Sequence, residues 1–265
     1  CAAAEGARKV RITGGEPLER ADLADIVAAV ACVPGVAEVA VTTNGVLLAD
    51  RARELKGAGL DRANVSLDTL RPERFRRIAG ADVHGRVMDG IAEALRTFDV
   101  VKVNTVLLRG VNEDELEDFV RFGASRAVRV RFIERYPTRG APLGGPILTC
   151  EEARGRLERT FGPLVPMPGD RLSVEAVYAV PGAGATVGFI ASATSPPCGR
   201  CSKLRVTAAG ELLPCLFAKE GVALAGLLRA GDAAGLRAAI RAVLDRKVHA
   251  GGRGGGLAAA RRAGG

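Results

Sequence analysis

The stretch VVKVNTVLLRGVNEDELEDFVRFGASRAVRVRFIE, residues 100–134, decides the fold of this chain. It opens with a valine-rich run, continues through an acidic segment with helical spacing, and closes with a second valine-rich run. Short apolar runs predict strands, and an amphipathic segment between two of them predicts a crossover helix. We therefore expect parallel strands over residues 100–108 and 128–134, joined by a helix over residues 113–123.

The same alternation of strand and helix extends towards the N-terminus. Apolar runs that end at turn residues predict further strands, and segments with apolar residues three and four apart predict further helices. We expect strands at 10–12, 36–42 and 64–67, and helices at 23–30, 47–58, 72–78 and 86–98. Such repetition predicts a parallel sheet or barrel with helices outside it.

The pattern changes after Tyr136, where a loop rich in proline and glycine begins. Thr149 is expected to cap a helix that runs through Phe161, and residues 162–169 read as a linker. Short strands and a final helix around Asp232–Arg246 follow, and the Gly- and Arg-rich end reads as a flexible tail. These changes divide the chain into domains of residues 1–161 and 162–248 and a tail of residues 249–265.

The composition favours a small anionic ligand. The chain of 265 residues has a net charge of +8 and an excess of arginine, which binds phosphate oxygens in pairs. The alternative is a solvated basic surface. No cluster of basic residues interleaved with aromatic ones occurs, so we expect no nucleic acid partner, and a nucleotide remains the better prediction.

Membrane insertion and secretion are not expected. No stretch approaches the roughly 20 apolar residues of a membrane span, and no signal-peptide pattern opens the chain. The six cysteines read as reduced thiols of a cytoplasmic protein rather than as three disulfides.

Three cysteines near the C-terminus indicate a metal centre. Cys198 and Cys201 are separated by two residues, and Cys215 follows after thirteen more. Thiolates select zinc or iron–sulfur clusters, and a structural zinc ion normally takes four protein ligands. Three ligands therefore predict an iron–sulfur cluster with one open iron. The alternative is three free thiols in a small apolar core.

Polar residues follow or lie on all five predicted strands, where parallel α/β folds bind ligands. Lys102 interrupts an apolar run, and an unpaired charge there would be costly, which favours a functional role. The polar positions are residues 13–17, residues 42–45, Ser66 with Asp68, Lys102 with Asn104, and Arg131 with Glu134.

These segments resemble the successive motifs of the MoaA family, the radical S-adenosylmethionine (SAM) enzymes that act as GTP 3′,8-cyclases in molybdenum-cofactor (molybdopterin) biosynthesis. The cysteine triplet and the terminal glycine pair also resemble that family. The motifs are RITGGEP at 11–17, TTNG at 42–45, NVSLD at 64–68, KVNTV at 102–106 and RFIE at 131–134.

The resemblance implies an α/β fold, an incomplete (β/α)6-type radical SAM barrel followed by a C-terminal α+β region that binds an auxiliary cluster and substrate. It also implies a lyase that converts GTP to (8S)-3′,8-cyclo-7,8-dihydroguanosine 5′-triphosphate by radical chemistry. In the family, one [4Fe-4S] cluster works with SAM, and a second [4Fe-4S] cluster in the C-terminal region binds GTP at its open iron. The implied partners are GTP, a reductant for the cluster and, downstream, cyclic pyranopterin monophosphate synthase; a homodimer is left open.

The same resemblance implies site residues. SAM contacts are implied for Gly15, Ser66 and Tyr136, although the family usually has methionine at the position of Tyr136. Ser202 and Lys203 stand where the family usually has asparagine and arginine. GTP contacts are implied for Arg11, Thr42, Lys102, Lys203, Leu204 and Arg205. Cluster ligation is implied for Cys198, Cys201 and Cys215, and a catalytic role for the tail residues Gly264 and Gly265.

The first cluster motif of radical SAM enzymes, three cysteines spaced by three and then two residues, does not occur in this sequence. We therefore expect this chain alone to be inactive, through truncation or degeneration, and Cys1 is not expected to be a ligand. Two alternatives remain: a non-catalytic or degenerate homologue that binds a cluster, zinc or a nucleotide, and another radical SAM enzyme with an auxiliary cluster that acts on a peptide.

Overall fold

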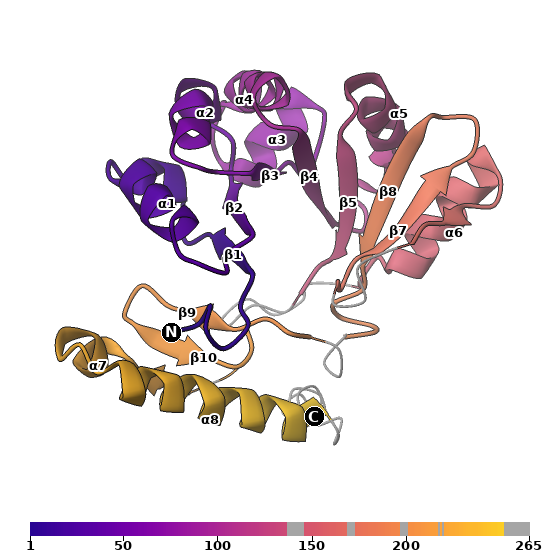
Figure 1. The fold of residues 1–265 in the computed structure, drawn as a ribbon. Helices are drawn as coiled ribbons and strands as arrows, with labels where there is room; N and C mark the ends of the chain where they lie inside the picture. Colours follow the sequence, from indigo (N-terminus) through magenta and orange to yellow (C-terminus); the bar gives the residue numbers. More distant parts are fainter. Residues whose placement is uncertain (137–145, 169–172, 197–200, 217, 219, 252–265) are drawn as a thin grey trace. The chain divides into compact units, whose positions relative to one another are not determined.

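A computed structural model describes residues 1–136, 146–168, 173–196, 201–216, 218 and 220–251, with side chains described through Lys247 (Figure 1). The chain divides into two compact units. The larger unit comprises residues 9–170 and 175–196, and the smaller unit comprises residues 1–8, 171–174 and 197–265. The predicted domain boundaries at residues 161 and 248 stay a prediction.

The larger unit is built on one eight-stranded sheet with the order β1-β2-β3-β4-β5-β8-β7-β6. The neighbours from β1 to β5 run parallel, as does β8 beside β5, whereas β7 and β6 are antiparallel. This confirms the predicted parallel sheet, whose edges in the described part are β1 and β6. The strands are β1 Lys9–Ile12, β2 Glu38–Thr43, β3 Arg62–Ser66, β4 Val100–Leu107, β5 Arg129–Glu134, β6 Val165–Pro166, β7 Ala176–Val180 and β8 Ala185–Ile190.

Helices lie outside the curved sheet, as the alternation predicts (Figure 1). Between them and the sheet lies one core, to which the strands contribute every second residue, including Val39, Val41, Val101 and Val103. Burial of this apolar face holds the layers together. The helices are α1 Leu23–Ala31, α2 Leu48–Gly57, α3 Pro72–Ala79, α4 His84–Thr97, α5 Leu116–Arg126 and α6 Cys150–Phe161, and short 3₁₀ turns cover Pro17–Glu19 and Glu113–Glu115.

Three details of the larger unit bear on the sequence prediction. Thr149 does cap α6: its hydroxyl accepts the Glu152 N–H at 3.1 Å, and the Glu152 carboxylate accepts the Thr149 N–H at 2.9 Å. The predicted linker at 162–169 is wrong in part, because Val165–Pro166 forms β6 and pairs with β7. The predicted helix at 113 begins instead as a 3₁₀ turn, because the buried Glu115 side chain bonds to another loop before α5 starts.

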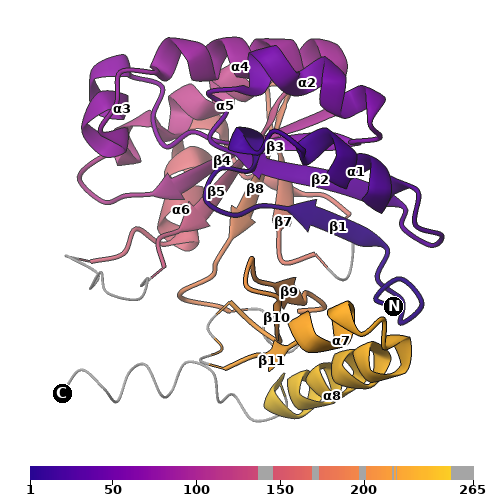
Figure 2. The ribbon, with the colours of Figure 1, turned by 90° about the vertical axis from the view of Figure 1, so that its left-hand side faces the viewer.

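In its described part, the smaller unit contains an antiparallel sheet of three short strands and two helices (Figure 2). Its core is small and is formed by Leu212, Leu224, Ile240 and Val243. The elements are β9 Arg205–Val206, β10 Glu211–Leu213, β11 Val222–Ala223, α7 Ala225–Arg229 and α8 Ala233–Gly251.

The last helix, α8, continues to Gly251 and so includes the first three residues of the predicted tail. The rest of that tail lies outside the described residues. The N-terminal segment belongs to the same unit. There the Glu5 carboxylate accepts two hydrogen bonds from the Arg241 guanidinium, at 2.8 and 3.0 Å.

Candidate functional site

One face of the larger sheet is polar, opposite the face that carries the core. Residues paired in register on parallel strands, and residues two apart along one strand, share a face. Three rows of paired residues follow: Arg11, Ala40 and Arg62; Thr42, Asn64, Lys102 and Arg129; and Ser66, Asn104, Arg131 and Gly188. The structure thus brings four of the predicted contacts, Arg11, Thr42, Ser66 and Lys102, onto one surface.

Asn64 is the polar centre of this face and is fully buried. Its Oδ1 accepts hydrogen bonds from Arg131 Nη2 at 2.7 Å and from Arg62 Nη1 at 2.8 Å. Its Nδ2 donates to the Val41 carbonyl at 2.9 Å and to the Thr42 hydroxyl at 3.4 Å. One amide therefore fixes two guanidinium groups and a hydroxyl that come from strands β2, β3 and β5.

A buried carboxylate, Glu175, faces the cations of this surface. Its Oε2 lies 3.4 Å from Lys102 Nζ and 3.7 Å from Arg131 Nη1, and its Oε1 lies 4.0 Å from Arg129 Nη1. A second carboxylate, Glu38, pairs with Arg62. With Arg11, which acts electrostatically on Arg131, the cations of this face outnumber its carboxylates.

Burial, and after it the neighbouring positive charges, shift two pKa values downward. Burial, opposed by Glu175 and reinforced by the neighbouring guanidinium groups, lowers the pKa of Lys102 to about 8. Burial and the charges of Arg11, Arg62 and Arg129 lower the pKa of Arg131 to about 10, again against the attraction of Glu175. Both shifts mean that the cationic forms are held at a cost, which an additional anion would relieve.

Part of this surface has unused hydrogen-bonding capacity. Within the described residues, the Nε groups of Arg129 and Arg131 and the Oδ1 of Asn104 are buried without a hydrogen-bond partner. Buried polar groups are normally satisfied, so such groups point to a ligand or to ordered water.

The loop after β1 is held against the loop after β2 by Glu16. Its carboxylate accepts the Thr43 hydroxyl at 2.6 Å, the Asn44 N–H at 2.6 Å and the Leu18 N–H at 3.1 Å. Gly15 precedes it and is exposed, as is Ser66 at the end of β3. The glutamate of the Gly-Gly-Glu-Pro segment is thus a structural residue that leaves the backbone of Gly15 accessible.

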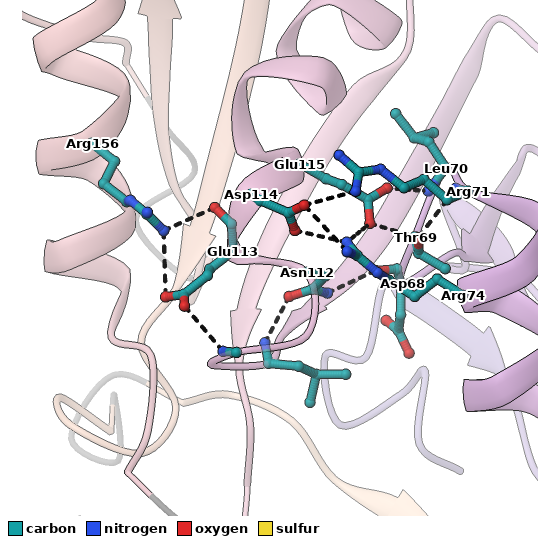
Figure 3. A network of polar contacts seen from close by, with 12 residues as sticks. Asp68, Thr69, Leu70, Arg71, Arg74, Asn112, Glu113, Asp114, Glu115 and Arg156 are labelled. Carbon is teal, nitrogen blue, oxygen red and sulfur yellow. Dashed lines mark hydrogen bonds and ion pairs between the residues drawn. The ribbon is translucent and has the colours of Figure 1, made fainter.

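The loop after β3 is locked by Glu115, which Figure 3 shows beside the start of α3. The buried Glu115 carboxylate accepts the Thr69 hydroxyl at 2.6 Å and the Leu70 N–H at 2.7 Å, and it pairs with Arg74. Charge-assisted bonds of this kind are among the strong ones in a protein. They fix the loop that carries the end of the NVSLD segment.

Asn112 completes that lock from the loop after β4. Its Nδ2 donates to the Asp68 carbonyl at 2.7 Å and to the Val106 carbonyl at 2.8 Å, and its Oδ1 accepts the Leu108 N–H at 2.9 Å. The Asp68 carboxylate in turn accepts the Val106 N–H at 2.8 Å. Burial raises the pKa of Asp68, although this backbone bond opposes the shift.

Glu134, the last residue of the RFIE segment, plays the same part at the end of β5. Its Oε1 accepts the Cys150 N–H at 2.9 Å and the Thr194 hydroxyl at 2.6 Å. Its Oε2 accepts the Ala193 N–H at 2.9 Å and the Thr194 N–H at 2.8 Å. The side chain therefore ties the ends of β5 and β8 to the start of α6.

In the smaller unit, Lys247 of α8 reaches the segments that carry two of the predicted ligands. Its Nζ donates to Cys201 Sγ at 3.4 Å and to the Pro214 carbonyl, next to Cys215, at 3.1 Å. It also contacts the Lys203 carbonyl. Burial opposes ionisation of Cys201, but the Lys203 backbone and the Lys247 ammonium outweigh it and lower the pKa of this thiol.

The remaining predicted residues are placed as follows. Leu204 packs against the small core, Arg205 begins β9, and Tyr136 is half-buried after β5. Cys198, Gly264 and Gly265 lie outside the described residues. Within the described ranges, no group of three His, Cys, Asp or Glu side chains is arranged so that it could hold a metal ion.

Comparison with known proteins assigns the family. Residues 1–123 match the Radical SAM superfamily, and residues 128–251 match Molybdenum Cofactor Synthesis C. The GTP 3′,8-cyclase of Heliobacterium modesticaldum is 43% identical over 90% of this chain and 74% of its own length. The chain belongs to the GTP 3′,8-cyclase family.

Two further members are longer, so that this chain covers a smaller share of each. GTP 3′,8-cyclase 1 of Mycobacterium tuberculosis is 44% identical over 85% of this chain and 65% of its own length. GTP 3′,8-cyclase 3 of Mycobacterium bovis is 41% identical over 87% of this chain and 63% of its own length. The chain thus spans about two thirds to three quarters of the GTP 3′,8-cyclases it matches.

Membership confirms the predicted class: radical SAM enzymes, lyases of molybdenum-cofactor biosynthesis whose cofactors are SAM and [4Fe-4S] clusters. In the described part of this GTP 3′,8-cyclase homologue, no helix is long and apolar enough to cross a membrane.

Sequence reasoning missed several residues of the polar face, including Arg62, Arg129 and Glu175. The first two lie two positions before Asn64 and Arg131, so their period-two spacing could have placed them on the same face. Glu175 and Lys247 gave no such signal, because each reaches its partners through tertiary contacts only.

Proposed function

We propose that this chain carries the GTP-binding surface and the second-cluster site of a GTP 3′,8-cyclase, and that it acts in the cytoplasm. The observation that carries the proposal is the polar face of the larger sheet, called the cationic face below. There, among the described residues, the cations outnumber the carboxylates, and the buried Nε donors of Arg129 and Arg131 lack hydrogen-bond partners. A triphosphate offers several acceptor oxygens and enough negative charge to offset clustered lysine and arginine. We place Arg11, Thr42 and Lys102 in contact with GTP.

The residues for a second cluster fit in type. Cys198, Cys201 and Cys215 supply three soft ligands, and a lowered pKa favours the thiolate of Cys201, the form that binds metal. Lys247 holds the segments of Cys201 and Cys215 through backbone carbonyls. A [4Fe-4S] cluster bound there would supply an open iron as a Lewis acid.

Further contacts extend the proposal. Lys203, Leu204 and Arg205 follow the second ligand directly, and we place them in contact with GTP. Gly15, Ser66 and Tyr136 are proposed SAM contacts, since Gly15 follows β1, Ser66 ends β3, and both are exposed. Gly264 and Gly265 are proposed to act in catalysis. A reductant, cyclic pyranopterin monophosphate synthase downstream, and a homodimeric state complete the proposal.

Anaerobic reconstitution with iron and sulfide tests the cluster. We expect about four iron atoms per chain, as in a [4Fe-4S] cluster, and a cluster spectrum that changes on addition of GTP. Cys215→Ala should lose the iron, whereas Cys32→Ala, at an exposed cysteine, should retain it. Zinc binding without a GTP effect would overturn the cluster assignment.

Calorimetric titration with GTP tests the cationic face. Lys102→Gln should weaken binding at least tenfold, because one charge-assisted contact is worth about 1.5–3 kcal/mol. Lys56→Gln, on the outer helix α2, is the matched control and should leave the affinity unchanged. Equal affinities for both variants and the unmodified chain would remove Lys102 from the GTP site.

A further inference from the structure

The feature that the proposed function leaves unexplained is the carboxylate of Glu175. Its side chain is only 6% exposed and lies among Lys102, Arg129 and Arg131, in the middle of a surface proposed to bind an anion. A buried carboxylate repels a phosphate group unless one of them moves away. The residue therefore opposes the ligand that its neighbours would attract.

The fold makes room for this carboxylate at Gly188 on β8. A Cβ atom at that position would lie 2.3 Å from Glu175 Oε1 and 2.9 Å from its Cδ. Contacts this short do not occur, so any side chain at residue 188 would force the carboxylate away from its present place. Gly188 lies in register with Arg131, one of the cations that the carboxylate faces.

We propose that Glu175 is a resident counter-anion, which neutralises the cationic face when substrate is absent and is displaced by the phosphate groups of the substrate. The inference rests on the proposed GTP site. Its physical basis is competition: the same ammonium and guanidinium groups serve either one carboxylate or the more strongly charged phosphate chain.

Because a phosphate ligand must displace the Glu175 carboxylate, binding depends on how much negative charge the ligand carries. A ligand with one phosphate replaces one anion by another of similar strength, whereas a triphosphate brings more charge than it displaces. The surface thus favours nucleoside triphosphates over monophosphates. The other charged residues that the strand pairing puts on this face are Lys9, Arg11, Arg62 and Glu38. Of these, Glu38 is paired with Arg62 and lies in register with Lys9.

The test compares two variants that remove the carboxylate in different ways. Glu175→Gln removes its charge, and Gly188→Ala displaces it without changing any charge. The probes are GTP and inorganic tripolyphosphate, titrated calorimetrically into the full chain. Both variants should bind tripolyphosphate about tenfold more tightly, equivalent to ~1.4 kcal/mol. GMP, titrated as the single-phosphate ligand, should gain at least as much, because one phosphate group is the least able to displace the carboxylate.

Stability provides the second readout. Without ligand, Glu175→Gln should unfold at lower temperature than the unmodified chain, because the buried cations lose their counter-anion. Lower stability combined with tighter phosphate binding is a signature that a merely structural residue would not give. Glu93→Gln is the charge control. Glu93 lies on the outer helix α4 and pairs with Arg53 of α2, so loss of its charge should not tighten phosphate binding.

The outcomes separate the two proposals. If the unmodified chain binds tripolyphosphate through Lys102 but both variants bind it equally or more weakly, the counter-anion role is wrong and the GTP site stands. If neither GTP nor tripolyphosphate binds to the unmodified chain or to Glu175→Gln, both proposals are overturned. An equal gain in Glu93→Gln would reduce the effect to net charge and also overturn the inference.

Discussion

Glu134→Gln offers the sharpest test of how the strand ends are held. The substitution keeps the size and shape of a buried side chain but exchanges one carboxylate oxygen for an amide NH2 group. Each carboxylate oxygen of Glu134 accepts two hydrogen bonds, from Cys150 and Thr194 on one and from Ala193 and Thr194 on the other. Whichever oxygen is replaced, two donors lose their acceptor.

The expected loss follows from those two bonds. Hydrogen bonds to charged groups contribute about 1.5–3 kcal/mol each, so two of them amount to roughly 3 kcal/mol or more. The loss should fall on the free energy of unfolding of the larger unit. Glu158→Gln is the matched control on α6, where a half-buried carboxylate pairs with Arg154 at 3.8 Å and contributes little.

Urea unfolding followed by circular dichroism gives the free energies, and hydrogen exchange of the Cys150, Ala193 and Thr194 amides shows where the change occurs. We expect faster exchange at these three amides in Glu134→Gln and not in Glu158→Gln. A destabilisation under about 1 kcal/mol, the net value of one ordinary hydrogen bond, would refute the reasoning.

Three further outcomes are expected. The affinity of the chain for tripolyphosphate should fall as the pH rises through about 8, because the bound anion raises the pKa of Lys102 above that value and the complex holds the Lys102 proton more tightly. Lys102→Arg should abolish this pH dependence. An affinity of the unmodified chain that does not change with pH would contradict the prediction. Iodoacetamide at pH 8 should modify Cys201 and spare Cys150, whose pKa burial raises to about 12, as mass spectrometry of the native apo chain would show. Gly90→Ala should lower the free energy of unfolding, measured in urea, by about 1–3 kcal/mol, since the alanine Cβ would lie 2.3 Å from the Gly45 carbonyl oxygen. Gly85→Ala on the same helix places its Cβ in open space and should not lower that free energy.

The strand–helix framework was predictable from sequence because it depends on local periodicity. The apolar residues of β4 alternate with Lys102 and Asn104, and this period-two pattern both identifies the strand and separates its two faces. The boundaries of α2 and α3 agree with the prediction to within one or two residues. Strand β6 escaped prediction because its two residues contain a proline and carry no periodic signal.

The polar motifs were harder to interpret, since one segment mixes two kinds of residue. In RFIE, Arg131 faces the other cations while Glu134 binds loop backbone. In RITGGEP, Arg11 lies on the polar face while Glu16 bonds to the loop after β2. Sequence alone identifies the segment but not which of its residues faces a ligand. The role of each residue depends on which side chains and backbone groups the tertiary structure places beside it.

The polar face also has a consequence for stability. A sheet face in a small α/β unit would ordinarily be filled by apolar side chains, yet here Lys102 and Arg131 are held with lowered pKa values, so their charge is maintained against desolvation. Glu175 offsets part of that cost. An anion that binds the folded form and not the unfolded chain must then stabilise the larger unit, by about 2.7 kcal/mol at a ligand concentration 100 times the Kd. Because the stabilisation acts through the sheet face, tripolyphosphate should slow exchange of the β3 and β4 amides and leave those of α8 unchanged.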